Sequence, residues 1–231
     1  MTDPNHATEQ ASKPFVQAEH KEFIPGPVGK LELVATAPKA DGQFAGAGLF
    51  AVVCHPNPQG GGTMNNKVVT TLVRAYRDLG IPAVRFNCRG VGASEGQFDN
   101  GVGEADDAAS VIAWARAQLP GSRLLLAGFS FGTGVATNAG FGQPDLEHLL
   151  LVAPPVSRYP YTREGRLPAP ALVCMGTEDE LVSHREVTEW VDQVHSPLLY
   201  KEFPGVCHFF HGHLTDLKRV ASEALIQHLG A

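Results

Sequence analysis

Apolar and polar positions along the chain follow two spacings, one typical of strands and the other of helices. Short continuous apolar runs are typical of strands that are covered on both faces of a sheet. We predict such strands at 49–54, 82–87, 124–128, 149–152, 171–175 and 198–203. Between them, apolar residues recur every three or four positions, which predicts amphipathic helices. The predicted helices cover 65–79, 103–119, a segment after Ser130, a segment opened by the capping box Ser183-x-x-Glu186, and 214–229.

The order of these elements predicts the fold class. Strands that alternate with helices form a mostly parallel central sheet with helices on both faces, which is an α/β architecture. Upstream, 21–24 and 30–36 are further strand candidates, and LELVAT in the second alternates as an outer antiparallel strand would. With these two at the edge, we expect a sheet of about seven or eight strands. Ligands bind at the carboxyl ends of the strands in such sheets.

The chain is expected to form one folded domain. It has 231 residues, 43% of them hydrophobic, and α/β chains of this length commonly fold around a single core. Residues 1–20 are polar and aperiodic. We therefore predict a flexible N-terminal tail over 1–20 and a single domain over 21–231.

Charge and composition argue against several classes of protein. The formal net charge is -6, and basic residues do not interleave with aromatic ones, so we expect no nucleic-acid partner. No apolar run reaches about 18 residues, and the N-terminus lacks the basic start and apolar centre of a signal peptide. We therefore expect no membrane partner and a cytoplasmic location. Cys54, Cys88 and Cys174 lie in or beside apolar runs, and no CxxC pair indicates a zinc ribbon or a disulfide framework.

The most informative stretch is 128–132, Gly-Phe-Ser-Phe-Gly, which is a G-x-S-x-G match between a predicted strand and a predicted helix. A serine that presents its hydroxyl at the end of a strand needs a sharp, strained turn, and residues two before and two after it are best as glycine. This context predicts Ser130 as a nucleophile. A second match, 92–96, places Ser94 in a loop with no helix after it, so Ser94 is disfavoured.

The loop at 55–62, HPNPQGGG, is a candidate for stabilising negative charge beside that serine. An oxyanion hole uses the backbone N–H of the residue after the nucleophile, here Phe131, and a second N–H from a loop after an earlier strand. Proline has no N–H, which leaves Asn57 or Gln59 as the second donor, and we favour Asn57. His55 is expected to brace the loop.

The chain resembles the α/β-hydrolases. The segments that carry the resemblance are HPNPQGGGTMNNKVV, RGVGASEGQFD, GFSFG, GTEDELV and CHFFHG, in the family's order of serine, acid and histidine. The likeness is strongest to small bacterial serine esterases related to dienelactone hydrolase, although the dienelactone enzymes use a cysteine nucleophile. The resemblance implies Ser130 as nucleophile, His208 as general base and Asp179 as the acid that orients the histidine.

Other side chains near this predicted triad offer alternatives. Glu178 and Glu180 flank Asp179, but the family pattern places the acid three residues before a small apolar residue, as Asp179 precedes Val182. A rival zinc site would use Cys207, His208, His211 and His213. Its spacing fits no standard zinc motif, so we expect no metal and no cofactor. Arg89 is expected to brace loops, and Glu104, Asp106 and Asp107 to complement a helix dipole.

The segment in which related hydrolases carry a lid is short. Only 154–170 is available there, which predicts an open, lidless pocket. Phe129, Phe131, Phe209 and Phe210 are expected near its walls, although phenylalanine is more often a core residue. An open site suits short, soluble esters.

These observations predict a serine esterase that acts on a small-molecule carboxylic ester through an acyl-enzyme. A thioesterase or peptidase would use the same three residues, so the sequence leaves these activities open. A non-catalytic binding module of the same fold is a third hypothesis, disfavoured because the serine, acid and histidine are all present. The sequence also leaves open whether the protein forms a homodimer.

Overall fold

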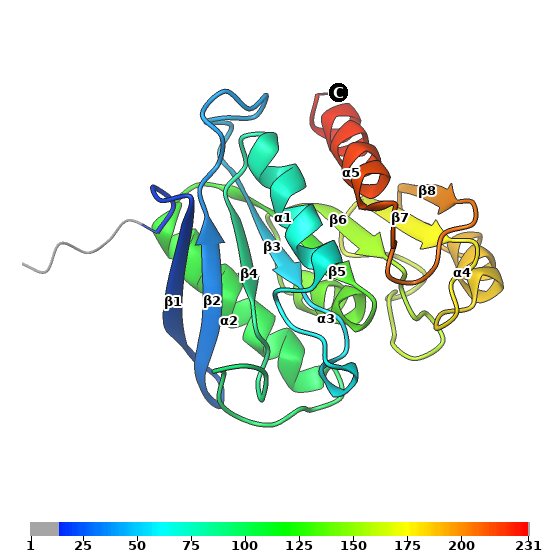
Figure 1. Ribbon diagram of the computed structural model, residues 1–231, viewed down its shortest axis with the longest axis horizontal. Helices are drawn as coiled ribbons and strands as arrows, with labels where there is room; N and C mark the ends of the chain where they lie inside the picture. Colours follow the sequence, from blue (N-terminus) through cyan, green and yellow to red (C-terminus); the bar gives the residue numbers. More distant parts are fainter. Residues whose placement is uncertain (1–13, 231) are drawn as a thin grey trace, which may run out of the picture.

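The computed structural model describes residues 14–230 and shows an eight-stranded sheet with helices on both faces (Figure 1). The strands lie in the order β1-β2-β4-β3-β5-β6-β7-β8. Their bounds are β1 Glu19–Gly26, β2 Gly29–Thr36, β3 Leu49–Cys54, β4 Ala83–Phe86, β5 Arg123–Phe129, β6 Leu146–Val152, β7 Ala171–Gly176 and β8 Leu198–Phe203. The pairs from β4 to β8 are parallel, while β1–β2 and β2–β4 are antiparallel. The predicted α/β-hydrolase fold is confirmed.

The helices cover the two faces of this sheet. They are α1 Lys67–Asp78, α2 Val102–Gln118, α3 Phe131–Gly140, α4 His184–Val191 and α5 Leu214–Leu229, with a short 3-10 helix, η1, at Pro58–Gly60. Helices α1 and α5 pack against each other on one face, whereas α2 and α3 pack together on the other (Figure 1). The central strands are buried on both faces, as continuous apolar sequences predict.

The antiparallel end of the sheet differs in detail from the expectation. Strand β1 forms the edge, and β2 lies between β1 and β4, where Leu31 and Leu33 are fully buried. The predicted tail over 1–20 lies largely outside the described residues. Within its described part, the ring of Phe15 lies 6.0 Å from that of Trp114, residues 16–19 are exposed, and β1 already begins at Glu19.

The parallel register aligns the carboxyl ends of the strands. Cys54 at the end of β3 pairs with Gly128 near the end of β5, and Val152 at the end of β6 pairs with both Phe129 and Cys174. The loops after β3, β5, β7 and β8 therefore meet at one edge of the sheet. Residues 154–170, all of them described, hold only an isolated bridge between Arg163 and Arg166, so no lid covers this edge.

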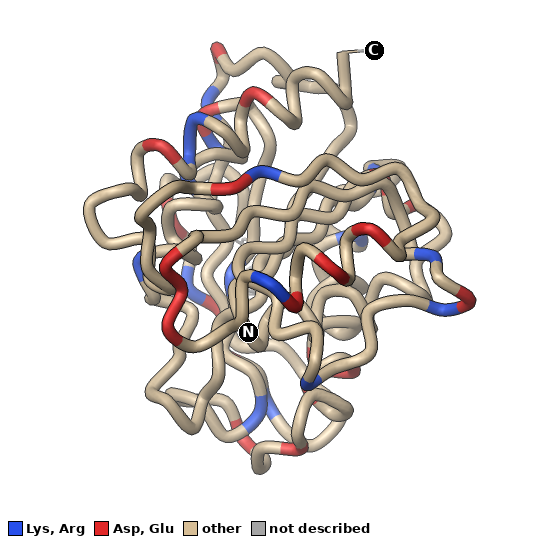
Figure 2. Tube along the Cα trace, turned by 90° about the vertical axis from the view of Figure 1, so that its right-hand side faces the viewer, with Lys and Arg blue, Asp and Glu red and all other residues tan. Residues whose placement is uncertain are grey.

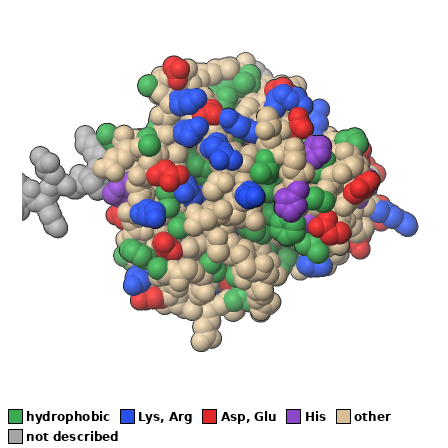
Figure 3. All heavy atoms as spheres, viewed as in Figure 1, with side chains coloured by type: hydrophobic (Ala, Val, Ile, Leu, Met, Phe, Trp, Pro, Cys, Tyr) green, Lys and Arg blue, Asp and Glu red, His purple; other side chains and the backbone are tan. Residues whose placement is uncertain are grey.

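The surface carries charges of both signs. In the tube view, acidic and basic residues are interspersed along the chain (Figure 2). On the face that carries α1 and α5, acidic side chains lie among the basic ones (Figure 3). Asp78 of α1, for example, contacts Lys39, Arg77 and Lys218. Within residues 14–230, no helix is both long enough and apolar enough to cross a membrane.

Candidate active site

Ser130 occupies a strained turn between β5 and α3. Its backbone lies at φ 53° and ψ −123°, a conformation that a residue with a side chain adopts only when its surroundings enforce it. The Ser130 N–H donates to the carbonyl oxygen of Val152, at the end of β6, over 2.8 Å. This turn directs the serine towards the carboxyl edge of the sheet, next to the N-terminus of α3.

The glycines on either side of Ser130 allow the turn. A β-carbon on Gly128 would lie 2.2 Å from the carbonyl oxygen of Gly132. A β-carbon on Gly132 would lie 2.4 Å from the carbonyl oxygen of Cys54 and 2.5 Å from that of His55. Both separations are shorter than van der Waals contact, so the first turn of α3 packs against β5 and the loop after β3 only with glycine at both positions.

The three residues predicted to form a triad are linked by two consecutive hydrogen bonds, with His208 between Ser130 and Asp179. The Nε2 atom of His208 lies 3.0 Å from Oγ of Ser130, and its Nδ1 atom lies 2.7 Å from Oδ2 of Asp179. An ionised carboxylate only accepts, so Nδ1 carries the proton and Nε2 accepts from the serine hydroxyl. The side chains of His208 and Asp179 are 2% and 0% exposed, which shields both hydrogen bonds from water.

Asp179 is held in place by the turn that follows β7. Its Oδ1 atom accepts from the backbone N–H groups of Leu181, at 2.9 Å, and Val182, at 2.8 Å. Glu180 instead accepts from the backbone N–H of His208 at 3.0 Å, and this hydrogen bond lowers the pKa of Glu180. Glu178 is exposed. Of the three neighbouring acids, Asp179 is therefore the one whose carboxylate contacts the imidazole.

The two candidate donors in the loop after β3 differ in what they bind. The N–H of Gln59 donates to Oδ1 of Asn57 at 3.0 Å, and Gln59 is exposed. Among the described residues, nothing accepts from the N–H of Asn57 or from that of Phe131, the first residue of α3. Asn57 lines the same cavity as Ser130. The N–H groups of Asn57 and Phe131 are therefore the two that the geometry favours as donors of an oxyanion hole.

His55 and Arg89 brace the neighbouring loops, as predicted. His55 donates from Nδ1 to the carbonyl oxygen of Pro56 at 2.7 Å and accepts at Nε2 from the N–H of Cys88 at 3.1 Å. Burial lowers the pKa of His55 to about 4, so the ring is neutral. Arg89 binds the fully buried carboxylate of Asp107 at 2.8 Å.

The acidic residues near the start of α2 have separate roles. Glu104 accepts from the N–H groups of Asp99 and Gly101, both at 2.7 Å, and so caps the helix as predicted. The prediction was wrong for Asp107, which pairs with Arg89 because that guanidinium is itself buried.

Ser94, in the second G-x-S-x-G match, has a structural role. Its hydroxyl donates to the carbonyl oxygen of Asn87 at 2.7 Å and accepts from the N–H of Glu32 at 2.9 Å. The side chain is nearly buried, and no histidine contacts its Oγ atom among the described residues. Ser94 therefore joins β2 to the loop after β4.

The cavity beside Ser130 has a volume of about 220 Å³. It is lined by Pro56, Asn57, Gly60, Gly61, Gly62, Asn66, Ser130, Arg158, Leu181, Val182, His208 and Phe209. Sequence reasoning did not single out Arg158 or Asn66. Asn66 carried a signal as the residue before an apolar helical pattern, and its Oδ1 atom does cap α1 by accepting from the N–H of Val68. Arg158 lies in an irregular segment whose sequence has no periodicity to place it.

Of the phenylalanines expected near the pocket, only Phe209 lines the cavity, and it is 37% exposed. Phe129 and Phe210 are fully buried, and Phe131 is 2% exposed, so these three rings belong to the core. Phe129 lies beneath the site, with its ring centroid 5.0 Å from that of His208. Phe210 packs against Phe203 of β8. The buried ring of Phe129 thus contacts both His208 and Phe209, and that of Phe210 anchors the same loop against β8.

The three histidines of the rival zinc site have separate partners. His208 contacts Ser130 and Asp179, the ring of His211 stacks on Phe209, and Nδ1 of His213 lies 3.3 Å from a carboxylate oxygen of Asp216. Within the part of the chain that the structure describes, no three His, Cys, Asp or Glu side chains are grouped to hold a metal ion.

Comparison with protein families gives a match along most of the chain. The family model of X-Pro dipeptidyl-peptidases, the S15 family, matches residues 15–198. This range includes Ser130 and Asp179 but stops before His208, whose position is known here from the structure. An uncharacterised protein of Rickettsia prowazekii is 34% identical over 216 residues, which cover 88% of this chain and 87% of that protein.

Two solved structures with a similar fold are described as α/β serine hydrolases. An α/β serine hydrolase homologue from Coxiella burnetii is 39% identical with a TM-score of 0.85, and the match covers 91% of this chain and 99% of that one. A lidless member of the α/β serine hydrolases from Xanthomonas campestris is 38% identical with a TM-score of 0.86. That match covers 92% of this chain and 96% of the other.

Proposed function

The chain belongs to the X-Pro dipeptidyl-peptidase (S15) family and has the fold of lidless α/β serine hydrolases, and we propose that it hydrolyses small soluble carboxylic esters through an acyl-enzyme on Ser130. One observation carries this proposal: at an uncovered cavity, two hydrogen bonds link Ser130 to His208 and His208 to Asp179. The first joins Oγ to Nε2 over 3.0 Å, and the second joins Nδ1 to Oδ2 over 2.7 Å. The family and the fold support a hydrolase, and the site suggests the class of substrate.

The chemistry follows from the three side chains. His208 Nε2 takes the hydroxyl proton as Ser130 Oγ attacks the ester carbonyl carbon, and Asp179 stabilises the resulting imidazolium. The developing oxyanion accepts from the N–H groups of Phe131 and Asn57. When the tetrahedral intermediate collapses, His208 returns the proton to the departing alcohol. A water molecule then attacks the acyl-enzyme by the same steps and releases the acid.

The family match makes peptidase activity the second candidate, and the cavity lining bears on it. A dipeptidyl-peptidase must bind the α-ammonium group of its substrate, and buried or partly buried ammonium groups need a carboxylate partner. No Asp or Glu lines the described cavity, whereas the guanidinium of Arg158 does line it. A neutral or anionic acyl group suits this lining better than a free N-terminus does. A thioester would use the same site.

Labelling with a fluorophosphonate tests whether the site is catalytic. We expect the probe to modify Ser130 in the wild type, and Ser130→Ala to abolish both labelling and esterase activity while the circular dichroism spectrum stays unchanged. Ser94→Ala is the matched control, since it removes a hydroxyl from the other G-x-S-x-G match and should keep the labelling. An unlabelled wild-type protein would favour the non-catalytic binding module.

Chromogenic substrates distinguish the two hydrolase activities. We expect turnover of p-nitrophenyl acetate or butyrate and none of glycyl-prolyl-p-nitroanilide. Comparable or faster cleavage of the anilide would replace the esterase proposal with the peptidase one. A thioester of the preferred acyl group, assayed in parallel, measures thioesterase activity, which is the remaining alternative.

A further inference from the structure

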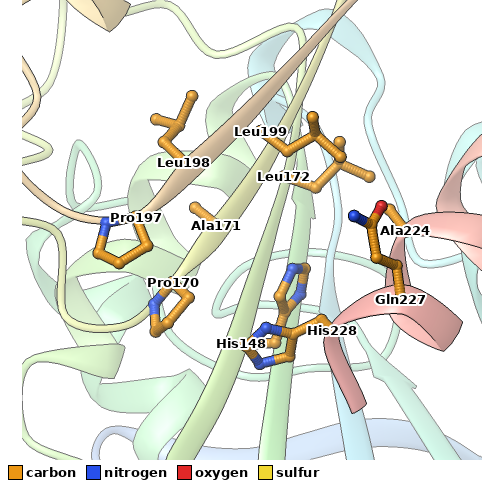
Figure 4. A pocket seen from close by; sticks show the side chains of 10 residues that line it. All are labelled: His148, Pro170, Ala171, Leu172, Pro197, Leu198, Leu199, Ala224, Gln227 and His228. Carbon is orange, nitrogen blue, oxygen red and sulfur yellow. The ribbon is translucent and has the colours of Figure 1, made fainter. Parts of the chain in front are cut away.

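A second cavity lies at the other end of the parallel strands from Ser130. It has a volume of about 400 Å³ and is bounded by β6, β7 and β8 on one side and the C-terminal half of α5 on the other (Figure 4). Its walls are formed by His148, Pro170, Ala171, Leu172, Pro197, Leu198, Leu199, Ala224, Gln227 and His228. Pro170 and Pro197 directly precede β7 and β8, which places the cavity at the amino ends of the parallel strands. The residues of the proposed triad all follow the carboxyl ends.

The polar side chains of this cavity are those of Gln227, His148 and His228, and the two imidazoles are in contact. The ring centroids of His148 and His228 are 4.8 Å apart, and Figure 4 shows the rings side by side below the apolar side chains. His148 is 3% exposed, and its Nδ1 atom has no hydrogen-bond partner among the described residues. Buried polar atoms in folded proteins nearly always have a partner, so an unpartnered nitrogen beside a cavity indicates a missing one.

An irregularity in the sheet accompanies this arrangement. Between β5 and β6 the register passes from Leu124 opposite Leu146 to Leu125 opposite His148, so Glu147 is an extra residue in β6. The carbonyl oxygen of Glu147 accepts from Nε2 of His228 at 3.1 Å. Bulges of this kind redirect the side chains beside them and are frequent next to binding sites. Here the bulge fixes both imidazoles, one through the strand and the other through its carbonyl.

The lining selects for a neutral ligand. No Asp, Glu, Lys or Arg lines the cavity. Burial, with a smaller contribution from His228, lowers the pKa of His148 to about 3, so His148 is uncharged at neutral pH. A charged ligand would lose its hydration without gaining a counter-ion. Two imidazoles also fall short of the three or four protein ligands that zinc takes.

We propose that this cavity is a binding site for a small neutral alcohol or phenol, whose apolar body contacts the proline and leucine side chains and whose hydroxyl binds His148. A hydroxyl both donates and accepts, so it can pair with a neutral imidazole in either tautomer. The cavity volume lies in the range of small-molecule sites, and a few placed polar groups in an apolar wall are typical of them. The site is separate from the cavity at Ser130.

Phenol, toluene and benzoate are matched probes for this site. In titrations followed by calorimetry and by NMR of the histidine rings, we expect phenol to bind about tenfold more tightly than toluene, which lacks the hydroxyl. Benzoate should not bind. The signals of His148 and His228 should shift with phenol, whereas those of His208 should stay in place. Equal affinities for phenol and toluene, or shifts confined to His208, would overturn the proposal.

Two substitutions separate the hydroxyl contact from the cavity itself. His148→Leu should reduce the affinity for phenol to that for toluene and leave toluene binding within about threefold, since only the polar contact is removed. Ala224→Phe should fill the cavity and abolish binding of both. His184→Leu, at a partly exposed histidine of α4 that contacts Glu202, is the control and should bind phenol as the wild type does. Full phenol affinity in both His148→Leu and Ala224→Phe, or tighter binding of Zn²⁺ than of phenol to the wild type, would contradict the assignment.

Discussion

At the scale of single residues, the site depends on backbone atoms as much as on the triad side chains. Ser130 has a positive φ, and the N–H groups of Phe131 and Asn57 are unpartnered among the described residues. Strain and unpaired donors both raise the free energy of the folded protein. Their concentration around one hydroxyl is expected where a substrate, rather than the protein, supplies the acceptor.

A pair of substitutions at one position isolates the proposed oxyanion donor. Asn57 has φ −51°, which proline can adopt, so Asn57→Pro removes the N–H with little change of backbone. We expect kcat for p-nitrophenyl acetate to fall about 100- to 1000-fold. Asn57→Ala is the control, because it loses the side-chain contact to Gln59 but keeps the N–H, and its kcat should fall less than about tenfold. Equal losses in the two variants would assign the effect to loop structure.

Buried histidines give the protein a defined sensitivity to acid. The pKa of His148 is lowered from 6.5 to about 3 by burial, so between these values the unfolded chain binds a proton that the folded chain does not. Stability from this residue is therefore complete above pH 6.5 and is lost as the pH falls towards 3. From pH 7 to pH 5, wild type should lose about 2 kcal/mol more free energy of unfolding than His148→Leu. Urea denaturation at both pH values measures this, and His184→Leu should behave like wild type.

The role of a residue could be predicted from the sequence where its chemistry leaves few alternatives. Ser130 was marked by its G-x-S-x-G turn and Asp179 and His208 by the resemblance to α/β-hydrolases, and the structure brings the three together. Phe129 and Phe210 were expected at the pocket and lie in the core. A phenylalanine beside a catalytic turn is apolar in either place, and only the surrounding packing decides which way its ring points.

At the scale of elements, the close approach of α3 to β3 and β5 sets the position of the nucleophile. Gly128→Ala and Gly132→Ala would each place a β-carbon within 2.5 Å of a carbonyl oxygen, so the helix must move. We expect each substitution to reduce the free energy of unfolding by about 1–3 kcal/mol and to reduce labelling of Ser130. Gly142→Ala is a suitable control, since Gly142 does not line the cavity and its β-carbon would lie 3.6 Å from the carbonyl oxygen of Ala139, an ordinary van der Waals contact. Unchanged stability and labelling in both elbow variants would contradict this account.

The loop after β4 is joined to α2 by a buried ion pair. Asp107 accepts from the backbone N–H of Arg89 at 2.8 Å as well as from its guanidinium, and this contact raises the pKa of Arg89. Removing one partner leaves the other charge buried and unpaired. Asp107→Ala should therefore destabilise the fold by about 3–5 kcal/mol in denaturant unfolding. Asp106→Ala, at a neighbouring acid on the same helix that forms no ion pair among the described residues, should change stability by less than about 0.5 kcal/mol.

Helices and strands could be predicted because their apolar periodicities are strong. Side-chain pairs between different elements could not be predicted. Strands β3 and β8 and helix α5 begin and end where the sequence predicts. Helix α1 begins at Lys67, two residues later than predicted, because the side chain of Asn66 caps it. The pairing of Asp107 with Arg89 escaped prediction because an acid in the first turns of a helix has a sufficient local explanation in the helix dipole.

At the scale of the whole molecule, the parallel sheet separates two sites at its opposite edges. The carboxyl edge carries the strained serine and its partners, and the amino edge carries the cavity with the paired imidazoles. Sequence reasoning located the first site because loops at carboxyl ends are expected to bind ligands. The second cavity lies between α5 and strands β6, β7 and β8, beside a bulge in β6, and neither the bulge nor this packing has a sequence signal.

Residues 154–170 form no lid over the cavity at Ser130, and this leads to a prediction about acyl-chain length. A cavity of about 220 Å³ encloses a short acyl group, and each enclosed methylene contributes about 0.8 kcal/mol, or roughly fourfold in kcat/KM. Further methylenes remain in water and add nothing. Along the p-nitrophenyl esters, kcat/KM should rise from acetate to about butyrate and stay level to octanoate, and emulsified palmitate should not be preferred. A rise that continued to palmitate would require an apolar surface that encloses the whole chain, in conflict with the open edge of this sheet.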